Sequence, residues 1–133
     1  MNTTTASASA SETETAIMAW AEGDYALETA SRITLTTTLR DQFIRSDGRP
    51  TRWLDEARRG PLEFAQPRWA DLLEAEDTYL SSSARFLAQL CQNIAHGSSL
   101  SGPLDLSRGL WQLDRSNSVA VLAALTEGMT RQA

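Results

Sequence analysis

The chain has 133 residues, of which 41% are hydrophobic and 22% charged, and its formal net charge is −5. This composition is ordinary for one soluble globular domain that is large enough to bury a core. A mildly acidic chain is not attracted as a whole to nucleic acid or to an anionic membrane. All twelve basic residues are arginine, and the absence of lysine excludes a Walker A nucleotide site, a pyridoxal phosphate Schiff base and a lysine-dependent kinase site.

The sequence shows no sign of export or of membrane insertion. Its single cysteine, Cys91, excludes an internal disulfide. The first twenty residues lack the basic and apolar regions of a secretory signal, and no apolar run approaches the roughly 18–20 residues that span a bilayer. We therefore expect a cytoplasmic protein with no membrane partner.

The N-terminus is a low-complexity segment rich in serine, threonine and alanine. It cannot bury enough apolar surface to offset its ordering entropy, so we interpret residues 1–11 as a flexible tail and 12–133 as a single helical domain. Residues 11–14 form an S-x-x-E capping-box pattern, which predicts the start of a helix. Gly23 either ends this helix, with Asp24 capping the next one, or lies at a kink.

Two long segments, about 24–45 and 67–96, have apolar side chains every three or four residues, which is typical of amphipathic helices. Inside the first, residues 32–40 alternate as a strand would. We favour a helix there because the helical spacing continues on both flanks and no partner strand is apparent. The second segment opens with Pro67, which suits a first helical turn, and ends before Gly97.

Shorter helices are expected between and after these segments. Thr51 can cap a short helix that ends at Gly60, and further short helices are expected at 104–113 and from about 118 to 128. The predicted fold is therefore all-α. It is a helical bundle with two long amphipathic helices plus shorter N-terminal, connecting and C-terminal helices.

Catalytic and metal-binding patterns are absent from the sequence. Cys91 and His96 are the only Cys/His pair, and on one helix they would lie about 140° apart around the axis, which excludes a nucleophile–base dyad. We interpret Cys91 as a small buried hydrophobe. A single histidine also excludes a di-iron site with two Glu-x-x-His pairs and a structural zinc site, and there is no G-x-S-x-G elbow. We therefore expect no enzyme activity, no cofactor and no metal site.

Basic and acidic residues are concentrated in neighbouring segments. The basic zone, residues 40–68, contributes the candidate interaction residues Arg49, Arg52, Arg58, Arg59 and Trp53, and Trp69 follows it directly. The acidic candidates are Asp71, Glu74 and Asp77. We favour pairing of the two sets, within one chain or between copies, over a partner-protein surface or a grip on nucleic acid.

Residues 113–125, LDRSNSVAVLAAL, begin like the recognition helix of a helix-turn-helix protein. However, seven successive apolar residues follow from Val119 to Leu125 and would cover every face of a helix, whereas a recognition helix needs a polar outer face. We therefore predict a helix buried on all sides by the bundle or by a second copy. Its interaction candidates are Val119, Leu122 and Leu125, together with Trp111.

These patterns favour a non-enzymatic helical protein that works by association, as an oligomeric scaffold, an accessory subunit or a small regulator. Its expected partner is a second copy, another protein or both. One alternative is a nucleic-acid-binding regulator that uses the basic zone from Arg40 to Arg68. Another is an acidic inhibitor that occupies a basic groove of its partner through the segment from Asp71 to Asp77.

Overall fold

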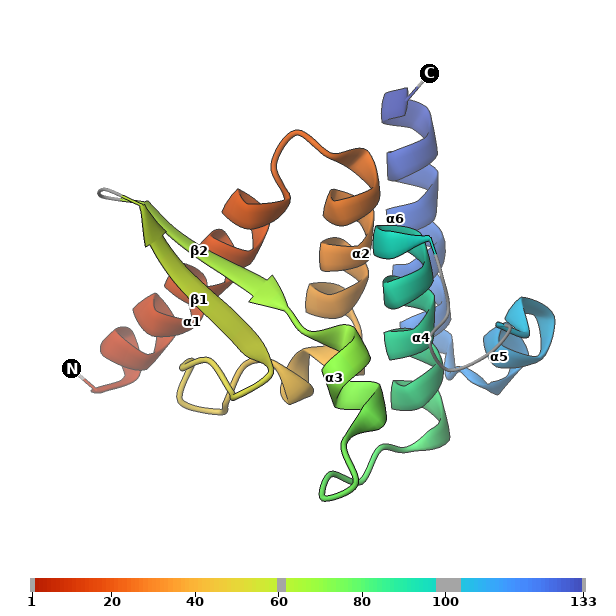
Figure 1. Ribbon diagram of the computed structural model, residues 1–133, viewed down its shortest axis with the longest axis horizontal. Helices are drawn as coiled ribbons and strands as arrows, with labels where there is room; N and C mark the ends of the chain where they lie inside the picture. Colours follow the sequence, from red (N-terminus) through yellow and green to blue (C-terminus); the bar gives the residue numbers. More distant parts are fainter. Residues whose placement is uncertain (1, 60–61, 98–103, 133) are drawn as a thin grey trace.

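The computed structural model describes residues 2–59, 62–97 and 104–132, and within them the protein is mostly helical with one β-hairpin (Figure 1). In chain order the elements are α1 Asn2–Ala21, α2 Tyr25–Thr36, a 3-10 helix Thr38–Gln42, β1 Leu54–Arg59, β2 Leu62–Pro67, α3 Trp69–Glu74, α4 Ser82–His96, α5 Leu106–Gln112 and α6 Arg115–Gln132.

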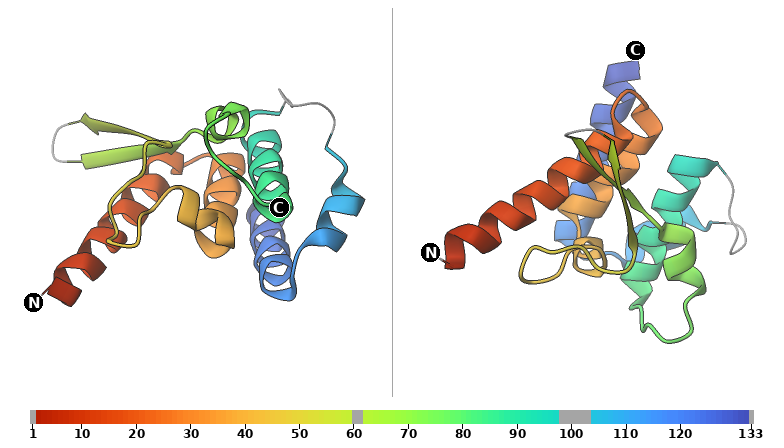
Figure 2. Two further views of the ribbon diagram at one scale, coloured as in Figure 1. Left: turned by 90° about the horizontal axis from the view of Figure 1, so that it is seen from below. Right: turned by 60° about the vertical axis from the view of Figure 1, so that its left-hand side comes forward.

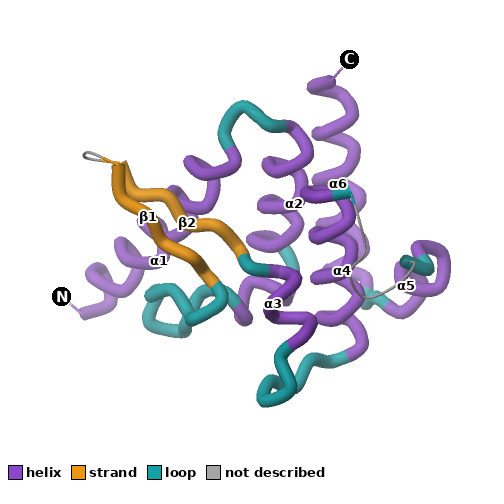
Figure 3. The backbone as a smooth tube through the Cα atoms, in the orientation of Figure 1, coloured by secondary structure: helices purple, strands orange, loops and turns teal. Residues whose placement is uncertain are grey.

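Helix α2 is the centre of the arrangement, because it packs against both α4 and α6 (Figure 2). Helix α1 crosses beside α2 and supports the hairpin through β2, as the orange strands in Figure 3 show. Helix α3 packs on α4, and α5 lies against α4 as well. The main core therefore forms where α1, α2, α3 and α4 meet, and α6 and α5 lie towards its edge.

Local capping explains where several helices begin and end. The side chain of Asp24 accepts hydrogen bonds from the backbone N–H groups of Ala26 and Leu27 and so starts α2, as the Gly23–Asp24 break allowed. Ser81 caps α4 in the same way through the N–H of Ala84. Gly97 ends α4 in the left-handed conformation with φ of 71°, which confirms the predicted stop.

The predicted long helix over 67–96 is wrong, because the chain forms two helices there, α3 and α4, separated by residues 75–81. The apolar spacing continues across the break, since Leu72 and Leu80 are both buried in the core. The serine cap described above starts a new helix, and Tyr79 lies exposed in the connection. Pro67, expected in the first helical turn, ends β2 instead.

The first long helix, predicted over 24–45, is also shorter than expected, because α2 ends at Thr36 and a 3-10 helix follows. Threonine chemistry accounts for the change. The hydroxyl of Thr37 donates to the carbonyl of Ile33 and accepts from the N–H of Leu39, so that it both closes α2 and caps the 3-10 turn. The strand alternative for 32–40 is wrong, since this segment is helical up to Thr36.

A hairpin replaces the short helix expected after Thr51. Strands β1 and β2 are antiparallel, with Leu54 opposite Pro67 and Glu56 opposite Ala65. Leu54, Ala65 and Pro67 are buried, and β2 packs on α1. The contact with α1, which residues 54–67 alone do not reveal, decides in favour of strands.

Helix α1 starts about ten residues earlier than the sequence indicated, since residues from Asn2 onward are helical where a flexible tail was expected. The segment contains several alanines and neither glycine nor proline, so its residues do not oppose a helical backbone strongly. Ile17 and Ala21, near the end of α1, belong to the buried residues of the fold.

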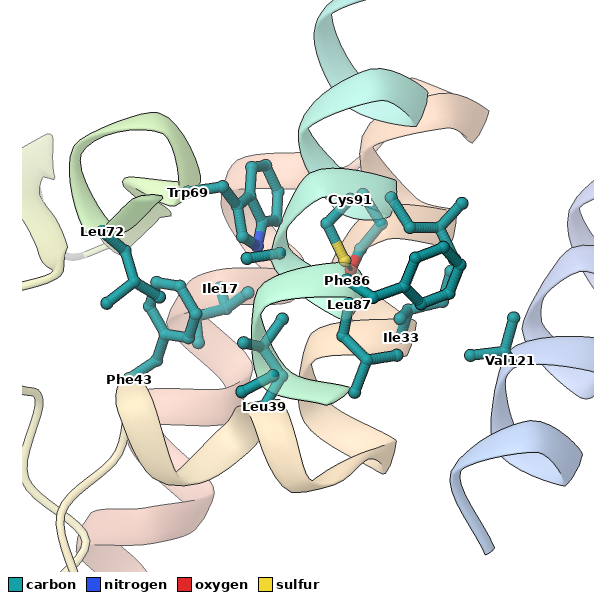
Figure 4. Packing of buried hydrophobic residues seen from close by; sticks show 14 of the residues in the cluster. Ile17, Ile33, Leu39, Phe43, Trp69, Leu72, Phe86, Leu87, Cys91 and Val121 are labelled. Carbon is teal, nitrogen blue, oxygen red and sulfur yellow. Dashed lines mark hydrogen bonds between the residues drawn. The ribbon is translucent and has the colours of Figure 1, made fainter. Parts of the chain in front are cut away.

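Helix α6 is not buried on all sides, contrary to the prediction. Asn117, Val121 and Ala124 face inward, and Figure 4 shows Val121 pointing from α6 towards the main cluster. Val119 and Leu122, in contrast, are 58% and 56% exposed. The apolar run covers every side of the helix, but α2 packs on only one of them.

Two neighbouring residues of α6 test this orientation. Val121→Asp places an unpaired charge at a position with no exposure, so we expect it to lower the free energy of unfolding by about 4 kcal/mol. Leu122→Asp places the same charge in solvent, so its cost in dilute protein should be about 1 kcal/mol or less. Urea denaturation followed by circular dichroism measures both, and equal losses would show that Leu122 is buried in the monomer.

Candidate interaction surface

The basic zone and the acidic candidates meet in one shallow hollow of about 350 Å³ between the start of the hairpin and α3. The guanidinium of Arg52 stacks on Trp53, 4.4 Å from the ring centroid, and its Nη2 donates to Oδ1 of Asp77 at 2.7 Å. Nε of Arg68 donates to Oδ2 of Asp71 at 2.8 Å. The favoured expectation of pairing within the chain is therefore confirmed for these residues.

The Arg52–Asp77 pair is exposed to solvent, and its hydrogen bond shifts the pKa of both groups. The bond from Arg52 lowers the pKa of the Asp77 carboxyl, and the bond to Asp77 raises the pKa of the Arg52 guanidinium. Asp77 therefore stays negative and Arg52 stays positive, and the two charges neutralise each other. Another arginine of the zone, Arg40, pairs with Glu14 of α1. The zone is consequently less positive than its arginine count indicates.

The other sequence candidates of this region differ in where they lie. Glu74 lines the same hollow and is exposed. Arg49 is exposed in the turn that precedes Thr51. The side chains of Arg58 and Arg59 lie outside the described part of the structure. Trp69 is only 1% exposed, so its predicted role at an interface is wrong: it is a core residue.

Trp69 belongs to a buried polar network that joins three helices. Its Nε1 donates to Oγ1 of Thr34 at 2.9 Å, and the same hydroxyl donates to the carbonyl of Ala30 at 2.9 Å. Sγ of Cys91 lies 3.5 Å from Oγ1 of Thr34 and 3.4 Å from the carbonyl oxygen of Ala30. Each of the three side chains is thereby satisfied without water, so the cluster has a structural role.

Cys91 is fully buried, which confirms its interpretation as a small hydrophobe. Burial raises the pKa of its thiol to about 12, so the nucleophilic thiolate is not formed near neutral pH. His96 is exposed at the end of α4, where its ring lies 6.1 Å from that of Trp69. Among the described residues, no three His, Cys, Asp or Glu side chains converge as metal ligands would.

A larger groove, of about 820 Å³, lies between α1, α2 and α6. Glu28 is nearly buried at its edge and accepts hydrogen bonds from the N–H of Gly23 at 3.2 Å and from Nη1 of Arg131 at 3.0 Å. The guanidinium of Arg131 also lies over Tyr25, 5.6 Å from the ring centroid. Sequence reasoning missed this cluster, because no local pattern connects Glu28 with an arginine 103 residues away.

The clearest exposed apolar surface is on α6. We define the outer face of α6 as Val119, Leu122, Ala123, Thr126 and Met129, which are exposed and lie on one side of the helix, since three- or four-residue steps lead from Val119 through Leu122 or Ala123 to Thr126 and Met129. Met129 is 72% exposed. Met129 was not among the residues predicted to interact, because the predicted helix ended at Gly128. The spacing of the exposed apolar residues nevertheless continues past that glycine.

Two further sequence candidates lie near this face without belonging to it. Leu125 is half-buried at its side. Trp111 on α5 is 87% exposed and lies four residues before Arg115, where α6 begins. The structure thus places Trp111, Val119 and Leu122 in solvent, where a partner can reach them.

The chain matches no protein-family model, and comparisons with curated proteins and with solved structures return no match. In the described part of the chain, no helix combines the length and the apolar character needed to cross a membrane.

The thiol of Cys91 gives a direct test of the core. Folding raises its pKa from 9.0 to about 12, so the unfolded chain loses the thiol proton at a lower pH than the folded protein. The stabilising contribution is complete below pH 9.0 and is lost as the pH rises towards 12. Above pH 9.0 the unfolding free energy should fall by about 1 kcal/mol per pH unit more than in Cys91→Ala, as measured by urea denaturation. Parallel pH profiles of the two proteins would contradict the burial of the thiol.

Proposed function

We propose that the protein is a non-enzymatic, cytoplasmic helical protein that works by association, as an oligomeric scaffold, an accessory subunit or a small regulator, and that the outer face of α6 is its docking surface. The observation that carries the proposal is the line of large apolar side chains, Val119, Leu122 and Met129, on a helix that is packed on its opposite side only. A cytoplasmic location accords with the single unpaired cysteine.

Energetics support a docking role for this face. Full burial of a side chain such as Leu or Met is worth about 1.5–3 kcal/mol, and these side chains are already partly covered, so each has about 1 kcal/mol left to gain from a partner. Residues 116–126 carry no charge, so a partner meets no desolvation penalty from an ionic group over three turns of the helix. A line of such residues fits an interface better than scattered exposed side chains do.

The two alternatives have less support. A nucleic-acid site needs unpaired cations, but Arg40, Arg52 and Arg68 each bind a carboxylate of the same chain. An acidic inhibitor needs free carboxylates, and Asp71 and Asp77 are the partners of two of those arginines. Because both signs of charge lie in one hollow, they attract each other there. The hollow is neither the purely positive surface that nucleic acid binds nor the purely negative one that a basic groove binds.

Site-specific cross-linking tests the docking surface. A photoreactive amino acid is placed at Leu122, and in a second variant at Tyr79, which is exposed to 88% but lies in the connection between α3 and α4. Illumination of intact producing cells should give adducts of discrete mass from position 122 and none from position 79. Circular dichroism confirms that both variants fold. Absence of adducts at 122, or equal adducts at both positions, would contradict docking through α6.

A further inference from the structure

We propose that the occupant of the outer face of α6 is a second copy of this chain, bound with the two α6 helices antiparallel about a two-fold axis. This inference rests on the proposed function of the face and adds the identity and the orientation of the partner. The face is one side of a single helix, so its occupant must be a surface of similar shape and polarity. The same face of a second copy meets that requirement.

The charges at the two ends of the face are complementary to those of a reversed copy. Arg115 is exposed at the start of α6 and has no ion-pair partner among the residues that the structure describes. Glu127 lies near the other end, where it binds Arg32 at 2.8 Å with its side chain still 47% exposed. An antiparallel copy brings Arg115 beside the second copy's Glu127, and the symmetry makes this contact twice. A parallel copy would instead place like charges together.

This pairing also fixes the register. The crossing point then lies midway between 115 and 127, which is near residue 121. On the outer face the side chains closest to that point are Val119, Leu122 and Ala123, so these three come to the centre of the contact. The charged groups form its rim, and this is the usual division of an interface into an apolar core and a polar edge. Exposed ion pairs add little affinity, but they select the orientation.

Small side chains allow the two helices to approach closely. Ala123 is exposed beside Leu122, and Ala120 flanks Val119. A leucine of one copy can therefore pack over an alanine of the other, as a knob in a shallow hole. The antiparallel arrangement also places opposite ends of the two helix dipoles together.

The size of the face sets the strength expected for the complex. One side of an 18-residue helix offers less than the roughly 800 Å² per partner of a standard stable interface. We therefore expect a dimer that dissociates on dilution, with a dissociation constant in the micromolar range. Because the contact is isologous it closes on itself, so assembly stops at two copies.

Sedimentation equilibrium of the purified full-length chain over a wide concentration range tests the stoichiometry. The mass should rise from one chain to two and then stop. Leu122→Asp should weaken association about tenfold or more, whereas Tyr79→Asp, away from the face, should leave it unchanged. Arg115→Glu should weaken it about threefold, because it places like charges beside the second copy's Glu127.

Disulfide trapping tests the orientation in the same protein, because the buried Cys91 does not interfere. Leu122→Cys should form a disulfide-linked dimer under mild oxidation. Met129→Cys should not, since antiparallel copies would separate the two sulfur-bearing positions by about 24 Å along the axis. Parallel helices would link both positions, and that result would overturn the proposed orientation.

The outcomes separate this inference from the proposed function. A purified chain that stays monomeric at every concentration, while Leu122 still gives adducts to a different protein in cells, overturns self-association and leaves the docking surface intact. Absence of both overturns the proposed function itself. An increase of mass that Leu122→Asp does not reduce places the dimer contact elsewhere and overturns the inference.

Discussion

The hydroxyl of Thr34 is the contact on which the packing of this protein depends. It lies in the last turn of the central helix α2, where it binds the indole N–H of Trp69 and adjoins the thiol of Cys91. One buried oxygen thus connects α2 with α3 and α4. A buried donor destabilises a fold unless its hydrogen bond is made, so the indole N–H of Trp69 favours the arrangement in which α3 meets α2 at Thr34. The apolar side chains of the core then pack around these three helices.

The central position of α2 explains why one side of α6 is left exposed to solvent. Helices α1, α4 and α6 all pack on α2, and α6 contacts it through Val121, Ala124 and Gly128. A Cβ atom at Gly128 would lie 2.3 Å from Oγ1 of Thr29, so the glycine is required for this close approach. No further described element covers the other side, and the apolar residues there remain in solvent. The same run of residues thereby supplies both core contacts and the proposed docking face.

The sequence predicted those features that depend on local patterns. The mostly helical character, the stop at Gly97 and the burial of Cys91 are confirmed, and so is the pairing of Arg52 with an acidic residue beyond Trp69. Two of the errors, at the hairpin and at α6, share one physical cause, which is that distant contacts decided the outcome. Strand β2 forms because it packs on α1, and Val119 is exposed because α2 packs on the opposite side of α6. Periodicity shows which residues are apolar, but not how many neighbours are available to cover them.

The central claim is that the outer face of α6 is open in one chain and covered in the functional assembly. Hydroxyl-radical footprinting as a function of protein concentration tests it most directly, because the oxidation rates of Leu122 and Met129 report their exposure. The account predicts rapid oxidation in dilute protein and protection at high concentration, while Val121 and Leu87 stay protected throughout. Protection of Leu122 in dilute monomer would contradict the fold of α6, and full reactivity at every concentration would contradict the association of the purified chain through this face.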